Sequence, residues 1–387
     1  MNFVLLSPHF PPNYHLFAVR LHEMGVNVLG LAEEAYDNLN DNLKSHLTEY
    51  YRVNDMHNYD ELVRALGYFT HKYGKINRIE SHNEYWLETE AKLRTDFNIF
   101  GIKNDQIDKI KQKSEMKKTF IKAQISAAKG ELVEDLGKAL KFIDAVGYPV
   151  IAKPDIGVGA YDTFKIHDKK ELKQFFDNKP DVVYFMEEFI DGIIQSFDGL
   201  TDQDGNIVFY TVHQYSTGVI NTVIKDKDIY YYSLRDIPTD IKDAGTKTLR
   251  AFNIKERFFH LEFFRTADNK LIALEVNMRP PGGMTTDMFN YANDIDIYKE
   301  YANVVSRNIF EAKYTRLKHC LYAGRKTYKN YLHSTDEIYH KFKNNIVHRE
   351  RLSGAFSPVL GDLGILLCSP KLDEIISMAE YIQAVEE

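Results

Sequence analysis

Apolar and polar positions in the first hundred residues alternate between two patterns. Short apolar runs, which predict buried strands, occupy 3–6, 26–31, 50–53 and 76–80. Longer stretches between them have apolar residues three and four apart, which predicts helices at 14–24, 60–73 and 85–97. Strands that alternate with helices are typical of a parallel, doubly wound sheet. No Gly-x-Gly-x-x-Gly follows the first strand, so the dinucleotide-binding fingerprint is absent.

Similar patterns continue through the rest of the chain. Residues 103–129 form a basic stretch that we expect to be helical, and further helices are expected at 134–145, 170–176, 237–253 and 296–309. Strands are expected at 148–154, 163–166, 182–186, 196–200 and 207–212. From Arg316 onward the sequence indicates a separate small α/β module.

The most informative pattern is a pair of apolar strands around the turn at 267–270. These strands should pair as a β-hairpin, with Glu262 on one strand and Glu275 on the other. Asn277 lies two residues after Glu275, and side chains two apart on a strand point to the same face. Arg279 continues that face before two prolines and two glycines end the strand.

These side chains have a shared chemistry. Carboxylate and amide oxygens suit Mg²⁺, which usually binds through a few carboxylates plus substrate phosphates. A guanidinium beside them can hold phosphate oxygens or a developing anion. The alternative is a surface hairpin with scattered polar residues. The apolar neighbours of Glu275, Leu274 and Val276, argue against it, because a half-buried acid without a partner or metal is costly.

A lysine and a glycine loop indicate a phosphate site elsewhere in the chain. Lys153 ends an apolar strand and is followed by Gly157 and Gly159. A lysine there can contact phosphate as a point charge, and glycines let backbone N–H groups approach closely. With the acidic hairpin, these are parts that phosphoryl transfer requires. The sequence has no Gly-x-x-x-x-Gly-Lys-Ser/Thr motif and no protein-kinase motifs, which excludes those two classes.

The order of these motifs resembles the ATP-grasp superfamily. The resemblance runs from about 105 to about 309 and rests on a lysine at a helix start, Gly-Tyr-Pro-Val-Ile-Ala-Lys-Pro at 147–154, the glycine loop, Met-Glu-Glu-Phe-Ile-Asp-Gly at 186–192, Glu262, and Glu-Val-Asn-Met-Arg at 275–279. It implies an ATP-grasp fold of α/β and α+β class in four parts. These are a Rossmann-like domain (1–103), an N-terminal lobe with its lid (104–186), a C-terminal lobe with the metal site (187–312) and a small C-terminal α/β module (313–387).

The resemblance also implies roles for individual residues. By register, Lys113 is preferred to Lys111 and Lys117 as the first ATP lysine. ATP would be held at its phosphates by Lys113, Lys153, Gly157 and Gly159, and at its adenine by the hinge residues Glu187, Glu188, Phe189 and Ile190. Mg²⁺ or Mn²⁺ would be bound by Glu262, Glu275 and Asn277, with Arg279 as the catalytic arginine.

Three features depart from the family pattern. Asp155 places a negative charge where phosphates are expected, so it should point outward or contact an amine. The acid that often follows the hinge glycine, Gly192, is missing, which leaves Gln195 or Asp198 as the expected ribose contact. His260 is either a core histidine bonded to the backbone or, as in the amino-acid ligase branch, a neighbour of the metal site.

The resemblance implies an ATP- and Mg²⁺-dependent ligase. It would phosphorylate a carboxylic acid, an amino acid or another small acid, and join the acylphosphate to an amine, releasing ADP and phosphate. The loops at 9–13 and 281–286 are expected substrate contacts. Two alternatives stay open: a bicarbonate-using carboxylase or carbamoyl phosphate synthetase-like enzyme, and a non-catalytic ATP-binding regulatory protein. The Met-Lys-Met biotin site is missing, and the metal ligands with Arg279 argue against lost turnover.

Composition narrows the range of partners. A net charge of -7 gives no general attraction to nucleic acid or to an anionic membrane. No window has the roughly 18 apolar residues of a membrane span, and the N-terminal residues lack a signal-peptide pattern. Two cysteines exclude a disulfide framework and favour a reducing cytoplasm. We therefore expect a cytoplasmic protein with small-molecule acid and amine substrates. The sequence does not determine the oligomeric state, and it is compatible with a homodimer.

Overall fold

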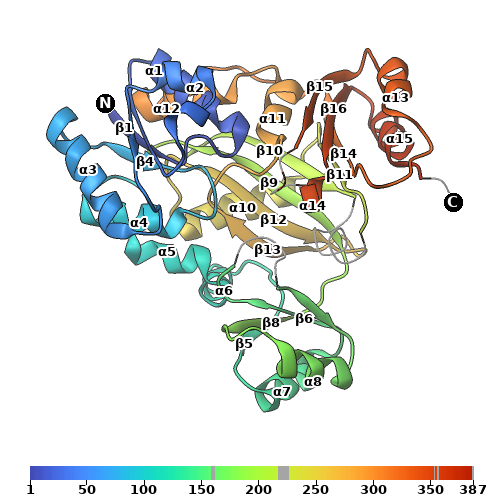
Figure 1. The fold of residues 1–387 in the computed structure, drawn as a ribbon. Helices are drawn as coiled ribbons and strands as arrows, with labels where there is room; N and C mark the ends of the chain where they lie inside the picture. The colour runs from blue at the N-terminus through green and yellow to red at the C-terminus, as the bar shows by residue number, and fades with distance from the viewer. Residues whose placement is uncertain (158–161, 217–225, 353, 355–356, 386–387) are drawn as a thin grey trace.

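The computed structural model describes residues 1–157, 162–216, 226–352, 354 and 357–385. Within these residues the strands form three sheets, of four, eight and four strands. Figure 1 shows the N-terminal and large sheets in the upper body of the molecule, with the other small sheet in a lobe below them. This mixture of parallel and antiparallel sheets with helices confirms the predicted fold class.

The N-terminal sheet is parallel throughout, in the order β3-β2-β1-β4. Its strands are β1 (Asn2–Leu6), β2 (Asn27–Ala32), β3 (Glu49–Arg52) and β4 (Arg78–Glu80). Its helices are α1 (His15–Glu23), α2 (Asp41–His46), α3 (Tyr59–Tyr73) and α4 (Leu87–Asp96), with the 3-10 helices η1 (Pro12–Tyr14) and η2 (Tyr36–Asn38). The parallel sheet predicted from the alternating pattern is confirmed. The sequence pattern did not predict α2, which is short and buries only Leu43.

The basic stretch at 103–129 forms two helices, α5 (Asn104–Lys111) and α6 (Lys113–Lys122). The chain is extended between them at Gln112. Asp155 caps the second helix, because its carboxylate accepts hydrogen bonds from the Ser114 backbone N–H at 2.8 Å and the Ser114 hydroxyl at 2.9 Å. This capping explains a negative charge beside the glycine loop, and it corrects the expectation that Asp155 points outward or meets an amine.

The small lobe is an antiparallel sheet in the order β5-β8-β6-β7. Its elements are β5 (Gly130–Val133), α7 (Leu136–Val146), β6 (Val150–Pro154), β7 (Phe164–Ile166), α8 (Lys169–Asn178) and β8 (Tyr184–Glu188). The lobe has a core of its own, which includes Phe175 and Tyr184. The predicted boundary after residue 186 falls inside β8, so Glu187 and Glu188 belong to the sheet of the small lobe.

The large sheet is antiparallel, in the order β13-β12-β9-β10-β11-β14-β16-β15. Its strands are β9 (Ile193–Thr201), β10 (Ile207–Tyr215), β11 (Tyr230–Ser233), β12 (Phe258–Arg265), β13 (Leu271–Asn277), β14 (His319–Arg325), β15 (Ile346–Arg351) and β16 (Leu363–Ser369). The associated helices are α10 (Thr239–Phe252), α11 (Thr285–Asn293), α12 (Ile297–Arg307), α13 (Thr335–Lys341), α14 (Ser357–Leu360) and α15 (Leu372–Gln383). The pairing of β11 with β14 makes the C-terminal strands part of this sheet. The strands expected in a small α/β module from Arg316 onward thus continue the large sheet through β11, which was not recognised in the sequence, and the boundary of that module stays a prediction.

An aromatic core joins the N-terminal domain to the large sheet. Phe17 of α1 meets Tyr298 and Tyr301 of α12 edge-on, with ring centroids 4.8 and 5.2 Å apart. Phe258 of β12 stacks on Tyr301 at 5.3 Å. Figure 1 shows α1 and α12 together at the top of the molecule. This packing holds the N-terminal sheet in a fixed position beside β12.

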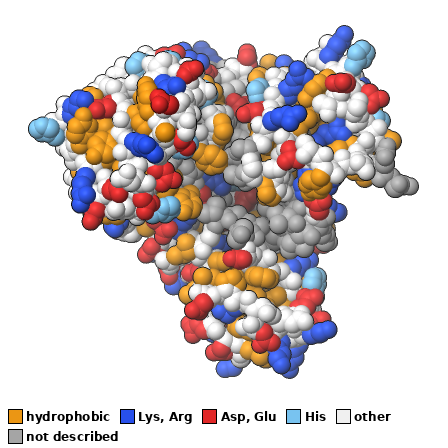
Figure 2. Space-filling view, viewed as in Figure 1, with side chains coloured by type: hydrophobic (Ala, Val, Ile, Leu, Met, Phe, Trp, Pro, Cys, Tyr) orange, Lys and Arg blue, Asp and Glu red, His pale blue; other side chains and the backbone are white. Residues whose placement is uncertain are grey.

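The surface has no single dominant charge on the face shown in Figure 2, where acidic and basic side chains are interspersed. Among the residues described, no helix combines the length and apolar character needed to cross a bilayer.

Candidate active site between an acidic hairpin and a lysine cluster

The predicted hairpin is present. Strands β12 and β13 pair antiparallel, with Glu262 directly opposite Glu275 and His260 opposite Asn277. Side chains alternate along each strand, so these four residues share one face. Val276, between Glu275 and Asn277, is buried in the core on the other face. The sequence pattern thus gives the hairpin one apolar face and one polar face, and the polar face carries the predicted metal ligands.

His260 connects the hairpin to a buried acid, Asp198, on the adjacent strand β9. Its Nδ1 lies 2.5 Å from Asp198, and its Nε2 lies 3.6 Å from Glu262. Burial would lower the pKa of His260, but the Asp198 carboxylate outweighs this and raises the pKa to about 9. Asp198 also accepts a hydrogen bond from the Ser196 hydroxyl at 2.6 Å and bonds to His213 at 2.7 Å. His260 is therefore a cation between two acids, not a core histidine bonded to the backbone.

Gln195 lies on the opposite face of the large sheet. Cross-strand pairing puts Gln195 beside the core residue Phe263, one residue out of step with Glu262. Neighbouring residues on a strand point to opposite faces, so Gln195 is turned away from Glu262. Its amide donates to Gln214 at 3.0 Å and accepts from Arg265 at 3.3 Å. The geometry does not support the predicted ribose contact of Gln195.

Lys117 and Lys153 pair with the buried carboxylate of Glu187, and Lys113 lies within its electrostatic reach. We refer to Lys113, Lys117 and Lys153 as the lysine cluster. Lys153 Nζ lies 2.5 Å from one carboxylate oxygen, and Lys117 Nζ lies 2.7 Å from the other. Burial would raise the pKa of Glu187, but these two lysines outweigh it and lower the pKa. The sequence register favoured Lys113 over Lys117 as an ATP lysine, but their spacing of four residues puts both on one face of α6.

The lysine cluster and the acidic hairpin act on each other electrostatically. Burial lowers the pKa of Lys113, and nearby Glu275 only partly offsets this. Burial would also lower the pKa of Lys153, but Glu187 and Glu275 outweigh it and raise the pKa. At Glu275 itself burial raises the pKa, against the smaller effect of Lys113 and Lys153. The fold thus brings cations from α6 and β6 to the carboxylates of the hairpin.

The predicted hinge residues do not point in one direction. Glu187 faces the lysine cluster, whereas Glu188 accepts a hydrogen bond from the Lys129 backbone N–H at 2.7 Å. Successive residues of β8 alternate between faces, which explains the difference. Phe189 and Ile190, just beyond β8, are half-buried. Their adenine contacts stay predictions, and of the two acids only Glu187 faces the site.

The glycine loop is described only in part. A Cβ on Gly157 would stand 3.5 Å from the Cβ of Pro154, which is an ordinary contact, so packing does not require glycine there. Gly159 lies outside the described residues. The phosphate contacts of both glycines stay predictions.

Arg279 follows β13 at the edge of the hairpin. Its Nη1 donates to the Pro280 carbonyl at 2.9 Å, and its Nε lies 3.5 Å from Glu84 Oε2. Burial would raise the pKa of Glu262, but His260 and, more weakly, Arg279 lower it. Arg279 therefore lies within electrostatic reach of the predicted metal ligands. Glu84 was not predicted, because no motif in the sequence marks it.

A buried ion network fixes the backbone just before the predicted catalytic arginine. The Nε of Arg257 donates to the Met278 carbonyl at 2.5 Å, and its Nη atoms lie 2.6 Å from Glu80 and 3.0 Å from Glu90. Arg94 pairs with the same two acids, at 2.9 and 2.7 Å. Two arginines and two glutamates balance in charge, which makes their burial tolerable. The N-terminal domain thereby holds the end of the hairpin in place.

The two loops expected to contact substrate lie together. The Asn13 amide donates to Asp287 at 3.1 Å and to Thr286 at 3.3 Å. The hydroxyls of Thr285 and Tyr231 are 2.9 Å apart, and both threonines are buried. These polar groups are bonded within the protein, so substrate contacts by the two loops stay predictions.

The polar face of the hairpin fits a divalent cation. Two half-buried carboxylates directly opposite each other repel without a cation, and the pKa of Glu275 is raised by burial and, to a smaller extent, by Glu262. Within the described parts of the chain, no group of three or more His, Cys, Asp or Glu side chains could hold a metal. Mg²⁺ here would therefore complete its shell with the Asn277 amide, water and phosphate oxygens, as Mg²⁺ usually does.

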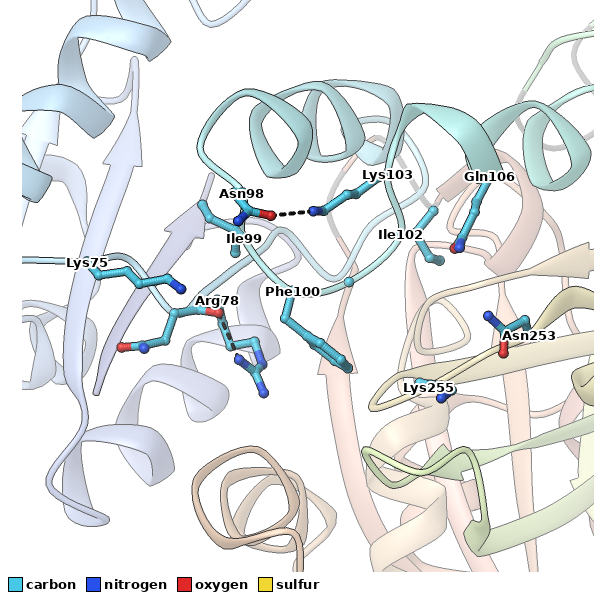
Figure 3. Close-up of a pocket in the computed structure, with 12 residues that line it drawn as sticks. Lys75, Arg78, Asn98, Ile99, Phe100, Ile102, Lys103, Gln106, Asn253 and Lys255 are labelled. Atoms are coloured by element: carbon cyan, nitrogen blue, oxygen red, sulfur yellow. Dashed lines mark hydrogen bonds between the residues drawn. The ribbon is translucent and has the colours of Figure 1, made fainter.

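A cavity of about 470 Å³ lies away from this site, between the N-terminal domain and the large sheet (Figure 3). Its lining includes none of the predicted site residues. Figure 3 shows the Lys103 ammonium bonded to the Asn98 side chain, at 2.8 Å. Arg78 lies 4.4 Å from the ring centroid of Phe100 and is paired with Glu256 at 2.8 Å. Two basic side chains that line the cavity, Lys103 and Arg78, are thus already bonded within the protein.

Comparisons with known proteins identify the domain that holds the site. Residues 146–287, which include β6, β8 and the hairpin, match the family model of the ATP-grasp domain. An L-arginine-specific L-amino acid ligase from Bacillus subtilis is 25% identical over 242 residues, covering 60% of this chain and 58% of that protein. The match thus spans less than two thirds of this curated relative.

Solved structures extend the likeness to the whole fold. L-amino acid ligase from Bacillus licheniformis matches with a TM-score of 0.75 at 13% identity, covering 98% of this chain and 96% of that one. N5-carboxyaminoimidazole synthetase from Staphylococcus aureus, complexed with ADP, matches with a TM-score of 0.72 at 14% identity, covering 99% and 96%. Residues 146–287 thus match an ATP-grasp domain, and the fold as a whole is similar to the folds of these two enzymes.

Proposed function

We propose that this protein is an ATP- and Mg²⁺-dependent ligase that joins a carboxylic acid to an amine through an acylphosphate. The observation that carries the proposal is that the acidic hairpin and Lys153, both within the residues that match an ATP-grasp domain, act on each other together with Lys113 of α6. Cations for phosphate and carboxylates for a metal ion are the two requirements of phosphoryl transfer from ATP. The amino acid ligases among the relatives support an amino acid or another small acid as substrate.

Each side of the site has a proposed task. Lys113 and Lys153 bind the phosphates of ATP, and the hinge beyond Glu187 receives the adenine. Mg²⁺, or Mn²⁺, would neutralise charge on the phosphates when bound by Glu262, Glu275 and Asn277. Arg279 holds an oxygen of the acid substrate.

The proposed reaction has two steps. A carboxylate oxygen of the acid attacks the γ-phosphorus of ATP, the bond from that phosphorus to the bridging oxygen breaks, and ADP leaves. The amine nitrogen then attacks the acyl carbon, the bond to phosphate breaks, and the nitrogen loses a proton as inorganic phosphate departs. Arg279 stabilises the negative charge that develops on the acyl oxygen in the second step.

The test is substrate-dependent ADP release over a panel of amino acids, other small acids and amines, with condensation products identified by mass spectrometry. Arg279→Met should abolish product formation, while Arg307→Met, a half-exposed arginine on α12, should leave it unchanged. Binding of ATP without ADP release for any acid and amine would favour the non-catalytic alternative instead.

We also propose a cytoplasmic location. Cys320 and Cys368 are free and buried, although they are cross-strand partners on β14 and β16. Only two cysteines in 387 residues give no disulfide framework of the kind that proteins in oxidising compartments use.

A further inference from the structure

We propose that the acid substrate is an α-amino acid, and that Glu84 binds its ammonium group while Arg279 holds its carboxylate. This inference rests on the function proposed above and adds a residue from outside the ATP-grasp domain. It starts from the position of Glu84, whose carboxylate meets Arg279 from a segment far away in the sequence.

Glu84 lies in the loop that follows β4, at the carboxyl edge of the parallel N-terminal sheet. Ligands of α/β sheets bind beyond this edge. Hydrogen bonds within the loop fix its shape: the Ser81 N–H donates to Glu90 at 2.6 Å, and the Trp86 N–H donates to Asn83 Oδ1 at 3.2 Å. A carboxylate on such a loop is presented to a ligand in a set position.

One oxygen of Glu84 is satisfied and the other is not. Oε1 accepts a hydrogen bond from Lys111 Nζ at 3.0 Å. Oε2 is buried and has no hydrogen-bond partner among the described residues, since Arg279 Nε at 3.5 Å is too far for a good hydrogen bond. Glu84 is only 8% exposed, so water does not readily replace the missing partner. A buried carboxylate oxygen left in this state is costly and needs an explanation, which an N–H donor on a ligand would supply.

The pair formed by Glu84 and Arg279 matches the charges of an α-amino acid. An amino acid carries an ammonium and a carboxylate on neighbouring atoms, so the ammonium can meet Glu84 while the carboxylate meets Arg279. The pair also borders the acidic hairpin, because the negative charge of Glu84 contributes to the raised pKa of Glu275. An acid without the amino group would leave Oε2 unbonded and place an extra negative charge beside Glu84.

The test compares amino acids with their des-amino analogues, such as alanine with propionate, as stimulators of ADP release. The proteins are the wild type, Glu84→Gln and Glu84→Asp, with Glu256→Gln as the matched control. Glu256 is also a buried carboxylate paired with an arginine, Arg78, but it lies outside the site.

We expect the wild type to respond to the amino acid and not to its analogue. In Glu84→Gln, the KM for the amino acid should rise on the order of 10- to 100-fold, as expected when a charged hydrogen bond is lost. The KM for ATP should not change. Glu84→Asp, which keeps the charge, should restore part of the discrimination, and Glu256→Gln should behave as the wild type does.

Two results would overturn the inference. The first is a wild type that uses the des-amino acid as well as the amino acid. The second is a Glu84→Gln variant whose kcat falls equally for all acids at unchanged KM, because Glu84 then only holds Arg279. Calorimetric binding of the amino acids in the presence of ADP separates this question from the proposed function. If an amino acid binds the wild type without turnover and does not bind Glu84→Gln, the ammonium site is supported and the ligase function is refuted. If no amino acid binds the wild type, the ammonium site is refuted.

Discussion

The lysine cluster and the acidic hairpin carry opposite charges, and they are built in opposite ways. In the cluster, two of the three lysines are paired within the protein, because Glu187 is bonded to Lys117 and Lys153. In the hairpin, two acids stand opposite each other, and His260 lies 3.6 Å from Glu262. Glu275 has no hydrogen-bond or ion-pair partner among the residues that the structure describes. Glu187 is thus paired within the protein on both of its oxygens, whereas Glu275 has no paired cation among the described residues.

The pKa directions of the buried Glu187 and the half-buried Glu275 follow this difference. Burial raises the pKa of both Glu187 and Glu275. Paired lysines reverse the effect at Glu187, whereas at Glu275 the more weakly interacting lysines do not. A buried acid kept in an unfavourable state is more easily explained by function than by stability. The comparison therefore predicts that substitutions on the two sides separate activity from stability.

The largest effect is expected from Glu275→Gln. Removing a carboxylate that a metal ion and ATP would share should lower substrate-dependent ADP release by roughly 100- to 1000-fold. The same substitution removes repulsion between facing acids, so the free energy of unfolding should stay equal or rise. An ADP assay and urea unfolding measure the two quantities, with the exposed Glu134→Gln as control. If stability falls together with activity, Glu275 is a structural residue and the comparison fails.

The opposite outcome is expected from Glu187→Gln. This substitution leaves the ammonium groups of Lys117 and Lys153 without their buried partner, so the free energy of unfolding should fall by roughly 3 kcal/mol. Urea unfolding at neutral pH gives the value. Glu188→Gln is the matched control, because among the described residues the Glu188 carboxylate bonds only to the backbone N–H of Lys129. Equal losses in both variants would show that the lysines are solvated and that the cluster is not self-contained.

The structural features that follow from the alternation of side chains along a strand could be predicted from the sequence. Alternation of apolar and polar residues placed Glu262, Glu275 and Asn277 on one face of a hairpin, as the structure confirms. The same reasoning gave the parallel N-terminal sheet. The ribose contact of Gln195 came from the family resemblance instead, and strand period speaks against it, because a register one residue different reverses the face to which a side chain points.

Contacts between distant segments could not be predicted, because no local pattern encodes them. Glu84 meets Arg279 only after the N-terminal sheet packs beside the hairpin. Asp155 appeared to conflict with a phosphate site until the structure placed it at the start of α6, where it caps Ser114. Likewise, Lys117 pairs with Glu187 only because the fold brings β8 next to α6.

A smaller effect should divide the lysine cluster itself. Lys113→Met removes a charge proposed to bind phosphate, so the KM for ATP should rise by roughly 10- to 100-fold. Its stability should not fall, because burial already lowers the pKa of Lys113. Lys117→Met should instead lower the free energy of unfolding by about 1 kcal/mol, since Glu187 loses one partner, with less change in KM. Steady-state kinetics gives the KM for ATP and urea unfolding gives the stability of both variants. If Lys117→Met raises the KM and Lys113→Met lowers the stability, the phosphate-binding role belongs to Lys117.

The smallest effect is a pH dependence that separates the wild type from Glu187→Gln. The folded pKa of Glu187 lies below its ordinary value of 4.5, so its stabilising contribution is fully present above that value. This contribution is lost as the pH falls through the lowered pKa of the folded protein, because Glu187 is then protonated in the folded as well as in the unfolded protein. The stability difference between the two proteins should stay constant from about pH 8 to about pH 5 and then narrow, by at most about 1.4 kcal/mol per pH unit. Urea unfolding at intervals across this range measures the difference. A difference that already narrows above pH 6 would point to titration of another group, and Glu187 would not be the acid that keeps the lysine cluster together.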